Sequence, residues 1–285
     1  MPTAIFLFMA VILSVGCASV SDARGLGFIT GMARQATESR DVEHLLRNGL
    51  RDEDGNVPTG GNVRNDSFQV SKKLLEKRVY FDHRITLYCG ASFDARKNIQ
   101  VPEGFTTPDH DERTGRVEWE HAVPAENFGR AFPAWREGDE ACVENGRYFR
   151  GRKCAELVSM EFRRMQADMY NLFPAIGSVN AVRSNYMYSE LPGIEPAFGS
   201  CEAKVRGRRF EPPDRAKGEV ARAALYMAQT YPSYRLSEQQ RRLFTAWDQM
   251  YPVTEWECVR AKRISRLQGN DNVFVKDVCV EAGLW

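Results

Sequence analysis

The feature that most restricts the fold of this chain is the segment 116–124, which reads RVEWEHAVP. Its valine and tryptophan alternate with glutamate, which predicts a strand with one buried face. Neighbouring residues of a regular strand point to opposite faces, so Glu120 and His121 can serve one site only where the strand ends or bends. Pro124 supplies such an end, because proline lacks the N–H that would continue a ladder of hydrogen bonds.

A second segment, 168–186 (DMYNLFPAIGSVNAVRSNY), forms the other half of the pattern. It is predicted to run from a polar helix end through an apolar turn, LFPAIG, into another helix. Asn180 falls in the first turn of that helix, and Ser178 has the side chain expected of its N-cap.

The first residues predict export. Residues 4–15 form an apolar run that is too short to span a bilayer and is typical of a signal peptide, which is assigned to residues 1–23. No Lys or Arg precedes this run, which departs from the usual pattern. A second interpretation stays open, because LSVGC resembles a lipobox and would make the chain a lipoprotein anchored through Cys17.

Cysteine usage points to the same compartment. Six cysteines remain once Cys17 is removed or lipidated, and an even number in an exported chain predicts disulfides. They are Cys89, Cys142, Cys154, Cys201, Cys258 and Cys279. The sequence does not fix the pairing, although Cys142 and Cys154 close a short loop and are the best candidate pair. A metal role is disfavoured, because the chain has no CxxC and no histidine at zinc-ligand spacing from a cysteine.

The composition, with 43% hydrophobic and 27% charged residues, indicates a soluble globular protein. Residues 24–66 are predicted to be an N-terminal extension, with an amphipathic helix at 35–50 and a Gly-, Asn- and Asp-rich linker at 51–66. A compact domain is predicted at 67–285. Helices are predicted there at 68–80, 156–170, 215–231, 237–251 and 254–268, and a strand-like alternation at 85–89.

The net charge of +1 says little about partners, whereas local clusters of charged and aromatic side chains are informative. The irregular segment 126–154 mixes cationic and aromatic side chains, which suits a nucleic-acid groove where phosphates meet Arg and bases stack on rings. A solvated loop pinned by a disulfide accounts for the same composition equally well. Arg215 and Arg222, near the start of a predicted helix, likewise fit either phosphate contact or a solvated basic face.

The two halves of the pattern hold the groups that a metal-assisted phosphodiesterase needs. Mg²⁺ takes oxygen ligands, keeps several waters and usually has one or two side-chain ligands. A neutral histidine takes a proton from the attacking water, and an arginine holds the non-bridging phosphate oxygens. Glu120, Asn180, His121 and a neighbouring Arg supply that set. An E-H dipeptide is common, however, so spacing alone does not establish the site.

The combination WEH…NL.PAIG..N..RSN, together with YPVTEWECVRAKRISRLQGNDNVF at 251–274, resembles the endonuclease I family of bacterial periplasmic and secreted nucleases. The resemblance runs from residue 68 to the C-terminus. It implies an α+β fold, that is, a helix-rich, mixed α/β domain that is stapled by disulfides and contains a ββα-metal (His-Me) finger. It also implies cleavage of DNA and RNA with little sequence preference, using one divalent ion and leaving 5′-phosphate ends.

The resemblance further implies a role for each matching residue. His121 would be the general base, and Glu120 and Asn180 would ligate one Mg²⁺, with Ca²⁺ or Mn²⁺ as substitutes. Asn171 would brace the finger. Arg152 best matches the phosphate-binding arginine of the family, with Arg147 as a competing candidate. Basic residues expected to contact nucleic acid are Arg147, Arg150, Lys153, Arg183, Arg215 and Arg222.

The chain also departs from the family pattern. Gln166 stands where the family has a carboxylate, and that position is expected to act chiefly through its backbone carbonyl, which orients His121. Asp271 replaces a histidine, and two missing cysteines imply three remaining disulfides. The alternative is therefore a catalytically silent, nucleic-acid-binding relative. In either case we expect an exported, periplasmic or secreted monomer without a stable protein partner, linked to a membrane only if Cys17 is lipidated.

Overall fold

The computed structural model describes residues 60–285. The predicted signal peptide, the alternative anchor at Cys17 and the helix predicted at 35–50 lie outside the described residues. No helix within 60–285 combines the length and apolar character that crossing a membrane requires.

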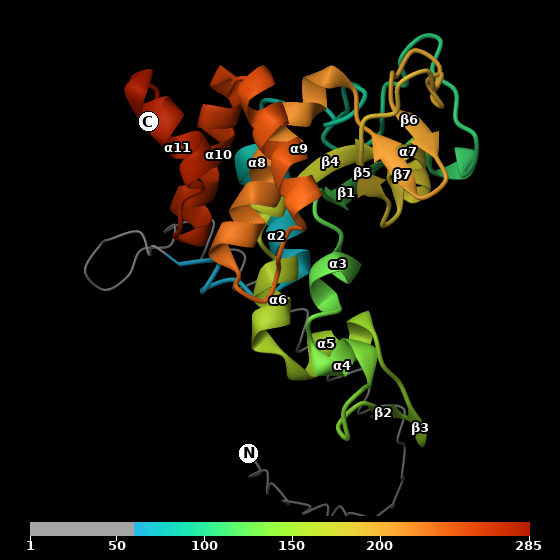
Figure 1. Cartoon of the computed structure of the whole chain (residues 1–285), viewed down its shortest axis with the longest axis vertical. Coiled ribbons are helices and arrows are strands. Elements are labelled where there is room, and N and C mark those ends of the chain that lie inside the picture. Colours follow the sequence, from blue (N-terminus) through green and yellow to red (C-terminus); the bar gives the residue numbers. More distant parts are fainter. Residues whose placement is uncertain (1–59) are drawn as a thin grey trace, which may run out of the picture. The chain divides into compact units, whose positions relative to one another are not determined.

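Helices and short strands alternate along the described chain (Figure 1). The α-helices are α2 (Phe68–Leu74), α3 (Ala125–Gly129), α4 (Pro133–Arg136), α5 (Arg152–Val158), α6 (Met160–Gln166), α7 (Gly177–Arg183), α8 (Asp214–Thr230), α9 (Glu238–Met250), α10 (Glu255–Gln268) and α11 (Val273–Glu281). Tighter or wider turns are η1 (Leu75–Val79, π-helical), η2 (Asp111–Arg113) and η3 (Met169–Asn171). The strands are β1 (Val117–His121), β2 (Val143–Glu144), β3 (Arg147–Tyr148), β4 (Leu172–Ile176), β5 (Met187–Tyr188), β6 (Lys204–Arg206) and β7 (Arg209–Glu211). This content confirms the predicted helix-rich α+β class.

Strands β1 and β4 pair antiparallel, with His121 opposite Leu172, and α7 follows β4 directly. The strand predicted in RVEWEH is confirmed, whereas the turn predicted at LFPAIG is wrong, because these residues form β4. Pro174 is tolerated in β4 because a two-stranded sheet leaves each strand an open edge. Along that edge the carbonyl of Pro174 accepts a hydrogen bond from the N–H of Leu87.

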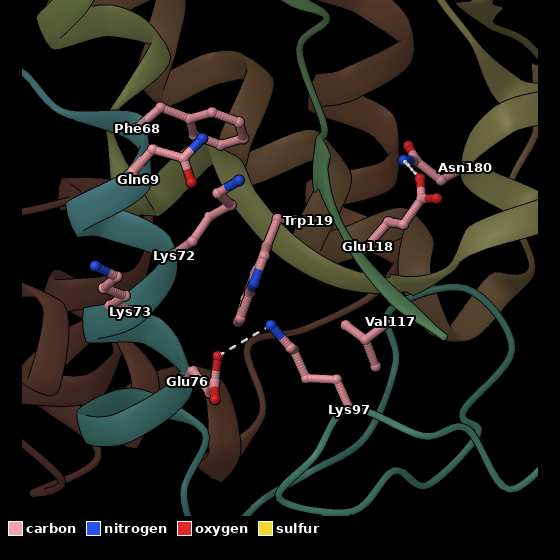
Figure 2. A pocket seen from close by; sticks show the side chains of 10 residues that line it. All are labelled: Phe68, Gln69, Lys72, Lys73, Glu76, Lys97, Val117, Glu118, Trp119 and Asn180. Atoms are coloured by element: carbon pink, nitrogen blue, oxygen red, sulfur yellow. Dashed lines mark hydrogen bonds and ion pairs between the residues drawn. The ribbon is translucent and has the colours of Figure 1, made fainter. Parts of the chain in front are cut away.

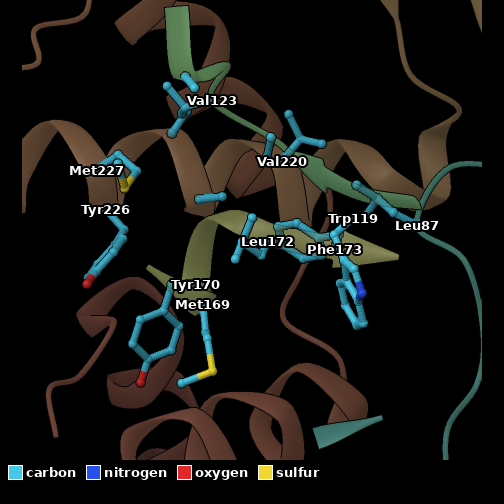
Figure 3. Packing of buried hydrophobic residues seen from close by; sticks show 14 of the residues in the cluster. Leu87, Trp119, Val123, Met169, Tyr170, Leu172, Phe173, Val220, Tyr226 and Met227 are labelled. Atoms are coloured by element: carbon cyan, nitrogen blue, oxygen red, sulfur yellow. The ribbon is translucent and has the colours of Figure 1, made fainter. Parts of the chain in front are cut away.

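The apolar core lies where this strand pair meets the long C-terminal helices (Figure 3). Its buried members include Trp119, Met169, Tyr170, Phe173, Val220, Tyr226 and Met227. The helices predicted at 215–231, 237–251 and 254–268 are confirmed as α8, α9 and α10. Ser237, the predicted N-cap of α9, forms a full capping box with Gln240.

Other helix boundaries differ from the prediction. The helix predicted at 156–170 is broken at Ser159, whose side chain accepts a bond from the N–H of Phe162 and begins α6. Ser178 does not cap α7. It is buried and accepts a bond from the hydroxyl of Thr114 instead. Helix α11 was not predicted, because its valine-rich sequence suggests a strand, whereas the Asn272 side chain caps it as a helix.

Two predictions in the N-terminal half are also wrong. The alternation at 85–89 forms no strand within the described chain, because Gly90, at φ 64°, closes a turn in which the N–H of Ala91 bonds to Thr86. The domain also begins before residue 67. Asn62 is buried, and its side chain donates to the carbonyl of Arg164 at 2.9 Å, so the last residues of the predicted linker pack on the domain.

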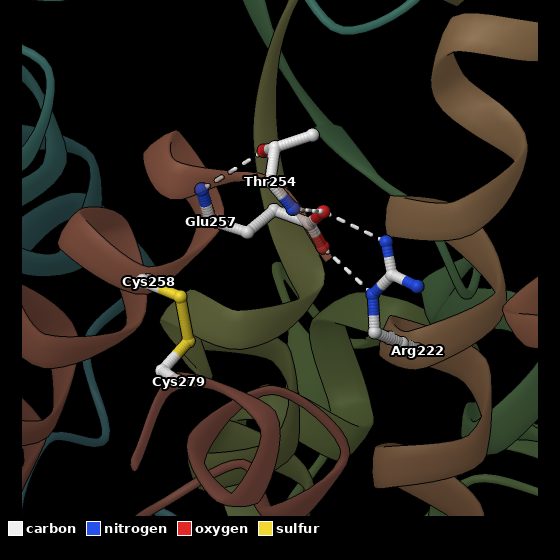
Figure 4. The surroundings of a disulfide bond; sticks show 5 residues. All are labelled: Arg222, Thr254, Glu257, Cys258 and Cys279. Atoms are coloured by element: carbon white, nitrogen blue, oxygen red, sulfur yellow. Dashed lines mark hydrogen bonds and ion pairs between the residues drawn. A yellow bond between two sulfur atoms is a disulfide. The ribbon is translucent and has the colours of Figure 1, made fainter. Parts of the chain in front are cut away.

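Three disulfides staple the described residues, as expected. They join Cys89 to Cys201, Cys142 to Cys154, and Cys258 to Cys279. The pair predicted at Cys142 and Cys154 is confirmed. The third bond ties α10 to α11 beside the ion pair of Arg222 with Glu257 (Figure 4).

A buried polar cluster lies behind β4, centred on the Asp168 carboxylate, which has no exposed surface. Its Oδ1 accepts bonds from the N–H of Tyr170 and the Nε2 of Gln268, each at 2.9 Å. Its Oδ2 accepts bonds from the hydroxyls of Tyr226 at 2.7 Å and Tyr231 at 2.6 Å. We call these five residues the Asp168 hub.

Candidate active site

The end of β1, the start of α7 and the start of α5 enclose one pocket of about 400 Å³. It is lined by the predicted site residues Glu120, His121, Asn180 and Arg152. Phe68, Trp119 and Arg183 complete the nearby wall. The structure therefore brings together, from three separate stretches of sequence, the carboxylate, imidazole, guanidinium and amide that the sequence singled out.

His121 is held in one orientation. Its Nε2 lies 2.9 Å from the backbone carbonyl of Gln166, and because a carbonyl only accepts, Nε2 carries the proton and Nδ1 is the free base. The expected contact of this carbonyl with His121 is confirmed. Burial, together with the positive charge of Arg152, lowers the pKa of His121 to about 3, so the ring is neutral near pH 7.

Glu120 is buried but keeps one oxygen free. Its Oε1 accepts a bond from the hydroxyl of Tyr88 at 2.7 Å and pairs with Nη1 of Arg183 at 3.0 Å. Burial raises the pKa of Glu120, while Arg183 and Tyr88 oppose that shift by stabilising the carboxylate. Among residues 60–285 its Oε2 has no hydrogen-bond or ion-pair partner, which leaves lone pairs available in the pocket.

Asn180 is oriented by a second carboxylate. Its Nδ2 donates to Oε2 of Glu118 at 2.7 Å, and Arg113 holds Glu118 from the other side. This bond uses the amide nitrogen and leaves the Asn180 carbonyl oxygen available to a ligand.

The free oxygens of Glu120 and Asn180 suit a hard divalent cation such as Mg²⁺. No three His, Cys, Asp or Glu side chains converge on a metal-sized site in the described chain. An ion in this pocket would therefore take two protein side chains and complete its shell with water and substrate, as Mg²⁺ does readily.

Arg152 lies beside the base. Its Nε and Nη2 donate to the side-chain oxygen of Gln166 at 3.2 and 3.1 Å, and Nε lies 3.4 Å from a Glu156 oxygen. Gln166 thus orients His121 through its backbone and Arg152 through its side chain. Arg147, the competing candidate, is exposed on β3 and does not line the pocket.

Asn171 lies behind the pocket, fully buried. Its side chain accepts from the N–H of Val123 at 2.7 Å and donates to the carbonyl of the same residue at 2.9 Å. These two bonds fix the chain just after it leaves β1, which is where Glu120 and His121 end the strand.

Two of the arginines expected to contact nucleic acid are buried. Arg183 is buried and donates to the carbonyl of His121 at 3.0 Å, in addition to its pairing with Glu120. Arg222 is also buried, between Glu257 and Asp248. Protein oxygens bind Nη1 and Nη2 of Arg183 and the Nε, Nη1 and Nη2 of Arg222, whereas Nε of Arg183 has no partner in the described chain.

The other expected contacts lie on the surface, away from the pocket lining. Arg215 is exposed, but its Nη1 donates to the carbonyls of Thr86 and Leu87, each at 2.9 Å. Arg150 donates to the carbonyl of Arg136, and Lys153 pairs with Glu144 at 2.7 Å. Their basic segment contains α3, α4 and the β2–β3 hairpin.

Two residues that the sequence did not single out, Glu118 and Tyr88, orient the two candidate metal ligands. The period-two spacing of a strand could have found Glu118, because it lies on the same face of β1 as Glu120. Nothing local marks Tyr88, because its position depends on a turn far from β1 in sequence.

Known proteins match most of this chain. The family model "Endonuclease I" matches residues 76–279. An extracellular deoxyribonuclease of Aeromonas hydrophila is 40% identical over 221 residues, which cover 75% of this chain and 89% of the relative. A periplasmic deoxyribonuclease of the same species is also 40% identical, with 86% of its length covered. Endonuclease-1 of Buchnera aphidicola (subsp. Acyrthosiphon pisum) is 36% identical over 213 residues, which cover 73% of this chain and 80% of the relative.

Proposed function

This chain belongs to the endonuclease I family, and from that premise we propose that it is a divalent-metal-dependent endonuclease that hydrolyses DNA and RNA to 5′-phosphate ends. The observation that carries the proposal is the single pocket shared by Glu120, His121, Asn180 and Arg152. In that pocket the imidazole Nδ1 and one oxygen each of Glu120 and Asn180 have no partner among the described residues.

Strands β1 and β4 and helix α7 form the ββα-metal finger in this proposal. The strand pair delivers Glu120 and His121 at the end of β1, and the first turn of α7 delivers Asn180. Asn171 braces the finger through its two bonds to Val123.

The residues present fit one Mg²⁺, held by Glu120 and Asn180, with Ca²⁺ or Mn²⁺ as substitutes. When bound, the ion would stabilise the negative charge that develops on the phosphate and on the leaving 3′ oxygen.

His121 and Arg152 supply the remaining chemistry. Nδ1 of His121 takes a proton from the attacking water while the water oxygen bonds to phosphorus. The P–O3′ bond breaks, the departing O3′ takes a proton from solvent to become a hydroxyl, and the phosphate stays on the 5′ carbon. The Gln166 carbonyl, bonded to Nε2, stabilises the imidazolium that results. Arg152, anchored by Gln166, holds the non-bridging oxygens.

Binding that is led by phosphates carries little sequence information and weakens as salt rises. The relatives named as deoxyribonucleases point to DNA as a substrate, and a pocket that contacts phosphate accepts RNA by the same chemistry. Their extracellular and periplasmic names agree with an exported protein, and we propose that it acts as a monomer. A lipidated Cys17 would instead hold it at a membrane.

The test is cleavage of plasmid DNA and of RNA by the oxidised protein, with Mg²⁺ or with EDTA. We expect nicking that requires the metal and disappears in His121→Ala, while that variant still binds DNA. Binding by the wild type without cleavage, with Mg²⁺, Mn²⁺ or Ca²⁺ present, would instead establish the silent, nucleic-acid-binding relative.

A further inference from the structure

A second pocket, of about 420 Å³, adjoins the active site. It shares Phe68, Trp119 and Asn180 with the active-site pocket and extends between α2 and β1. Figure 2 shows the side chains of Lys72 and Lys97 on either side of the Trp119 indole. The catalytic chemistry proposed above uses neither these lysines nor the indole N–H, so the pocket needs its own explanation.

The charges of this pocket favour an anion. Three lysines line it, Lys72 and Lys73 from α2 and Lys97 from the facing turn. Of its two carboxylates, Glu118 is held by Arg113 and Asn180, and Glu76 pairs with Lys97 at 3.4 Å, so the uncompensated positive charge of the pocket lies on Lys72 and Lys73. Lys72 makes no ion pair within residues 60–285. Burial, followed by repulsion from Lys97 and Arg152, lowers the pKa of Lys72, and the negative charge of a bound anion would oppose this shift by stabilising the ammonium.

The indole N–H of Trp119 requires an acceptor. Trp119 is 9% exposed, and its Nε1 is buried without a hydrogen-bond partner in the described chain. Indole nitrogen is only a donor, and buried donors in folded proteins are nearly always paired. Because Trp119 lines the pocket, an oxygen of a ligand bound beside Lys72 is a source of the missing acceptor.

The turn that carries Lys97 is built rigidly. Lys97 has φ 68°, a left-handed conformation that is uncommon for any residue other than Gly, Asn or Asp. Asp94 holds the turn by accepting bonds from the N–H groups of Arg96 and Asn98, each at 2.8 Å. Backbone strain of this kind is tolerated where the surrounding structure enforces it, and it tends to lie at functional sites.

We propose that this second pocket is a phosphate subsite for the nucleic-acid strand, holding the backbone phosphate next to the scissile one between Lys72, Lys97 and the Trp119 N–H. The inference rests on the proposed function, because the strand reaches this pocket from the active site. The two pockets share a wall at Phe68, Trp119 and Asn180, so one strand can occupy both.

The first test measures binding in EDTA, where no cleavage occurs, of a short single-stranded oligonucleotide to the wild type, Lys72→Ala and Lys77→Ala. Lys77 is exposed on the same helical segment but does not line the pocket, so it controls for the loss of one charge. We expect Lys72→Ala to weaken binding about tenfold and to reduce the slope of log K against log salt by about 1. Lys77→Ala should change binding less than about twofold.

Trp119→Phe provides a second variant, because it keeps an aromatic ring in the core and removes only the donor and one ring. We expect weaker oligonucleotide binding without loss of the folded state, as followed by circular dichroism. The wild type should also lose affinity for a trinucleotide when one of its two backbone phosphates is replaced by a neutral methylphosphonate. Lys72→Ala should lose much less from that replacement, because its partner is already absent.

A free phosphate ion and a backbone phosphate present the same oxygens to the pocket. A further experiment therefore tests whether inorganic phosphate alone binds there. The proposal predicts no rise in melting temperature with millimolar phosphate alone. Such a rise, abolished in Lys72→Ala and accompanied by no methylphosphonate effect, would overturn the strand assignment. Variants of Lys72 and Trp119 that bind like Lys77→Ala would overturn the subsite, whereas a wild type that neither binds nor cuts nucleic acid would overturn the proposed function itself.

Discussion

Two buried carboxylates, Glu120 and Asp168, make the most instructive comparison in this molecule. Burial raises the pKa of both. Asp168 has four donors, two on each oxygen, from the backbone of Tyr170 and from the side chains of the hub. Glu120 has its donors on one oxygen only. Burial and a raised pKa therefore do not distinguish the structural carboxylate, Asp168, from the candidate metal ligand, Glu120. The distinguishing feature is the carboxylate oxygen of Glu120 that accepts no hydrogen bond in the described chain.

The number of groups left without a protein partner also distinguishes Arg152 from the buried Arg183 and Arg222. Arg183 and Arg222 are buried and bound by protein oxygens, although Nε of Arg183 has no partner in the described chain, whereas the side chain of Arg152 is 41% exposed and is tethered on one edge by Gln166. A guanidinium has five donors, so Arg152 keeps donors for a phosphate. The following predictions test this distinction, from the largest expected effect to the smallest.

Glu120→Gln should reduce cleavage per folded molecule by about 10³-fold, equivalent to about 4 kcal/mol. The amide keeps the shape of the side chain but lacks the charge that a divalent ion needs. Single-turnover kinetics with the folded fraction set by circular dichroism would measure this. A loss smaller than tenfold would place the metal elsewhere.

Asp168→Asn should lower the free energy of unfolding by about 3 kcal/mol, because an amide N–H₂ would face donors and leave them unpaired. Cleavage per folded molecule should stay within a few-fold of the wild type, since no hub residue lines the pocket. Urea denaturation measures the first quantity. Unchanged stability together with lost activity would reverse the roles assigned to the two carboxylates.

Arg152→Ala should reduce the cleavage rate about a hundredfold, or about 2.7 kcal/mol, because it removes the group that holds the non-bridging oxygens. The matched control is Arg147→Ala, on the exposed β2–β3 hairpin, which should cost less than about threefold. Initial rates at saturating substrate compare the two. The opposite ranking would reassign the phosphate clamp to the hairpin.

Gln166→Ala should reduce the cleavage rate about fivefold. This factor corresponds to about 1 kcal/mol, which is the typical net free energy of one hydrogen bond. The substitution removes the tether of Arg152 but keeps the backbone carbonyl that orients His121. Because Arg152 is then already free, Arg152→Ala should cost less in this background than in the wild type. A double-mutant cycle measures that coupling, and strictly additive effects would contradict the tether.

The sequence predicted the side chains of the candidate site better than the strands and helices that carry them. His121, Glu120, Asn180 and Arg152 were all singled out, because reactive side chains in a specific order carry the resemblance, and the structure places them around one pocket. The strand at LFPAIG was missed because a proline argues against a strand unless its edge is open, and the sequence does not show edges. Helix α11 was missed because its valines favour a strand locally, and the cap and the disulfide that hold it depend on tertiary contacts.

The burial of Arg183 and Arg222 was also missed because it depends on tertiary contacts. A basic residue near a predicted site suggests contact with phosphate, yet the ion pairs that occupy Arg183 and Arg222 come from residues far away in sequence. Glu257, for example, belongs to α10, whereas Arg222 lies on α8. Local sequence gives charge but not the partner that neutralises it.

The most direct test of the distinction is calorimetric titration of the purified protein with Mn²⁺ or Mg²⁺ in the absence of nucleic acid, comparing the wild type, Glu120→Gln and Asp168→Asn. One ion should bind to the wild type and to Asp168→Asn with similar affinity, and Glu120→Gln should show no saturable binding. If Glu120→Gln binds the ion as the wild type does, the unfilled oxygen of Glu120 is not a metal ligand and the account fails.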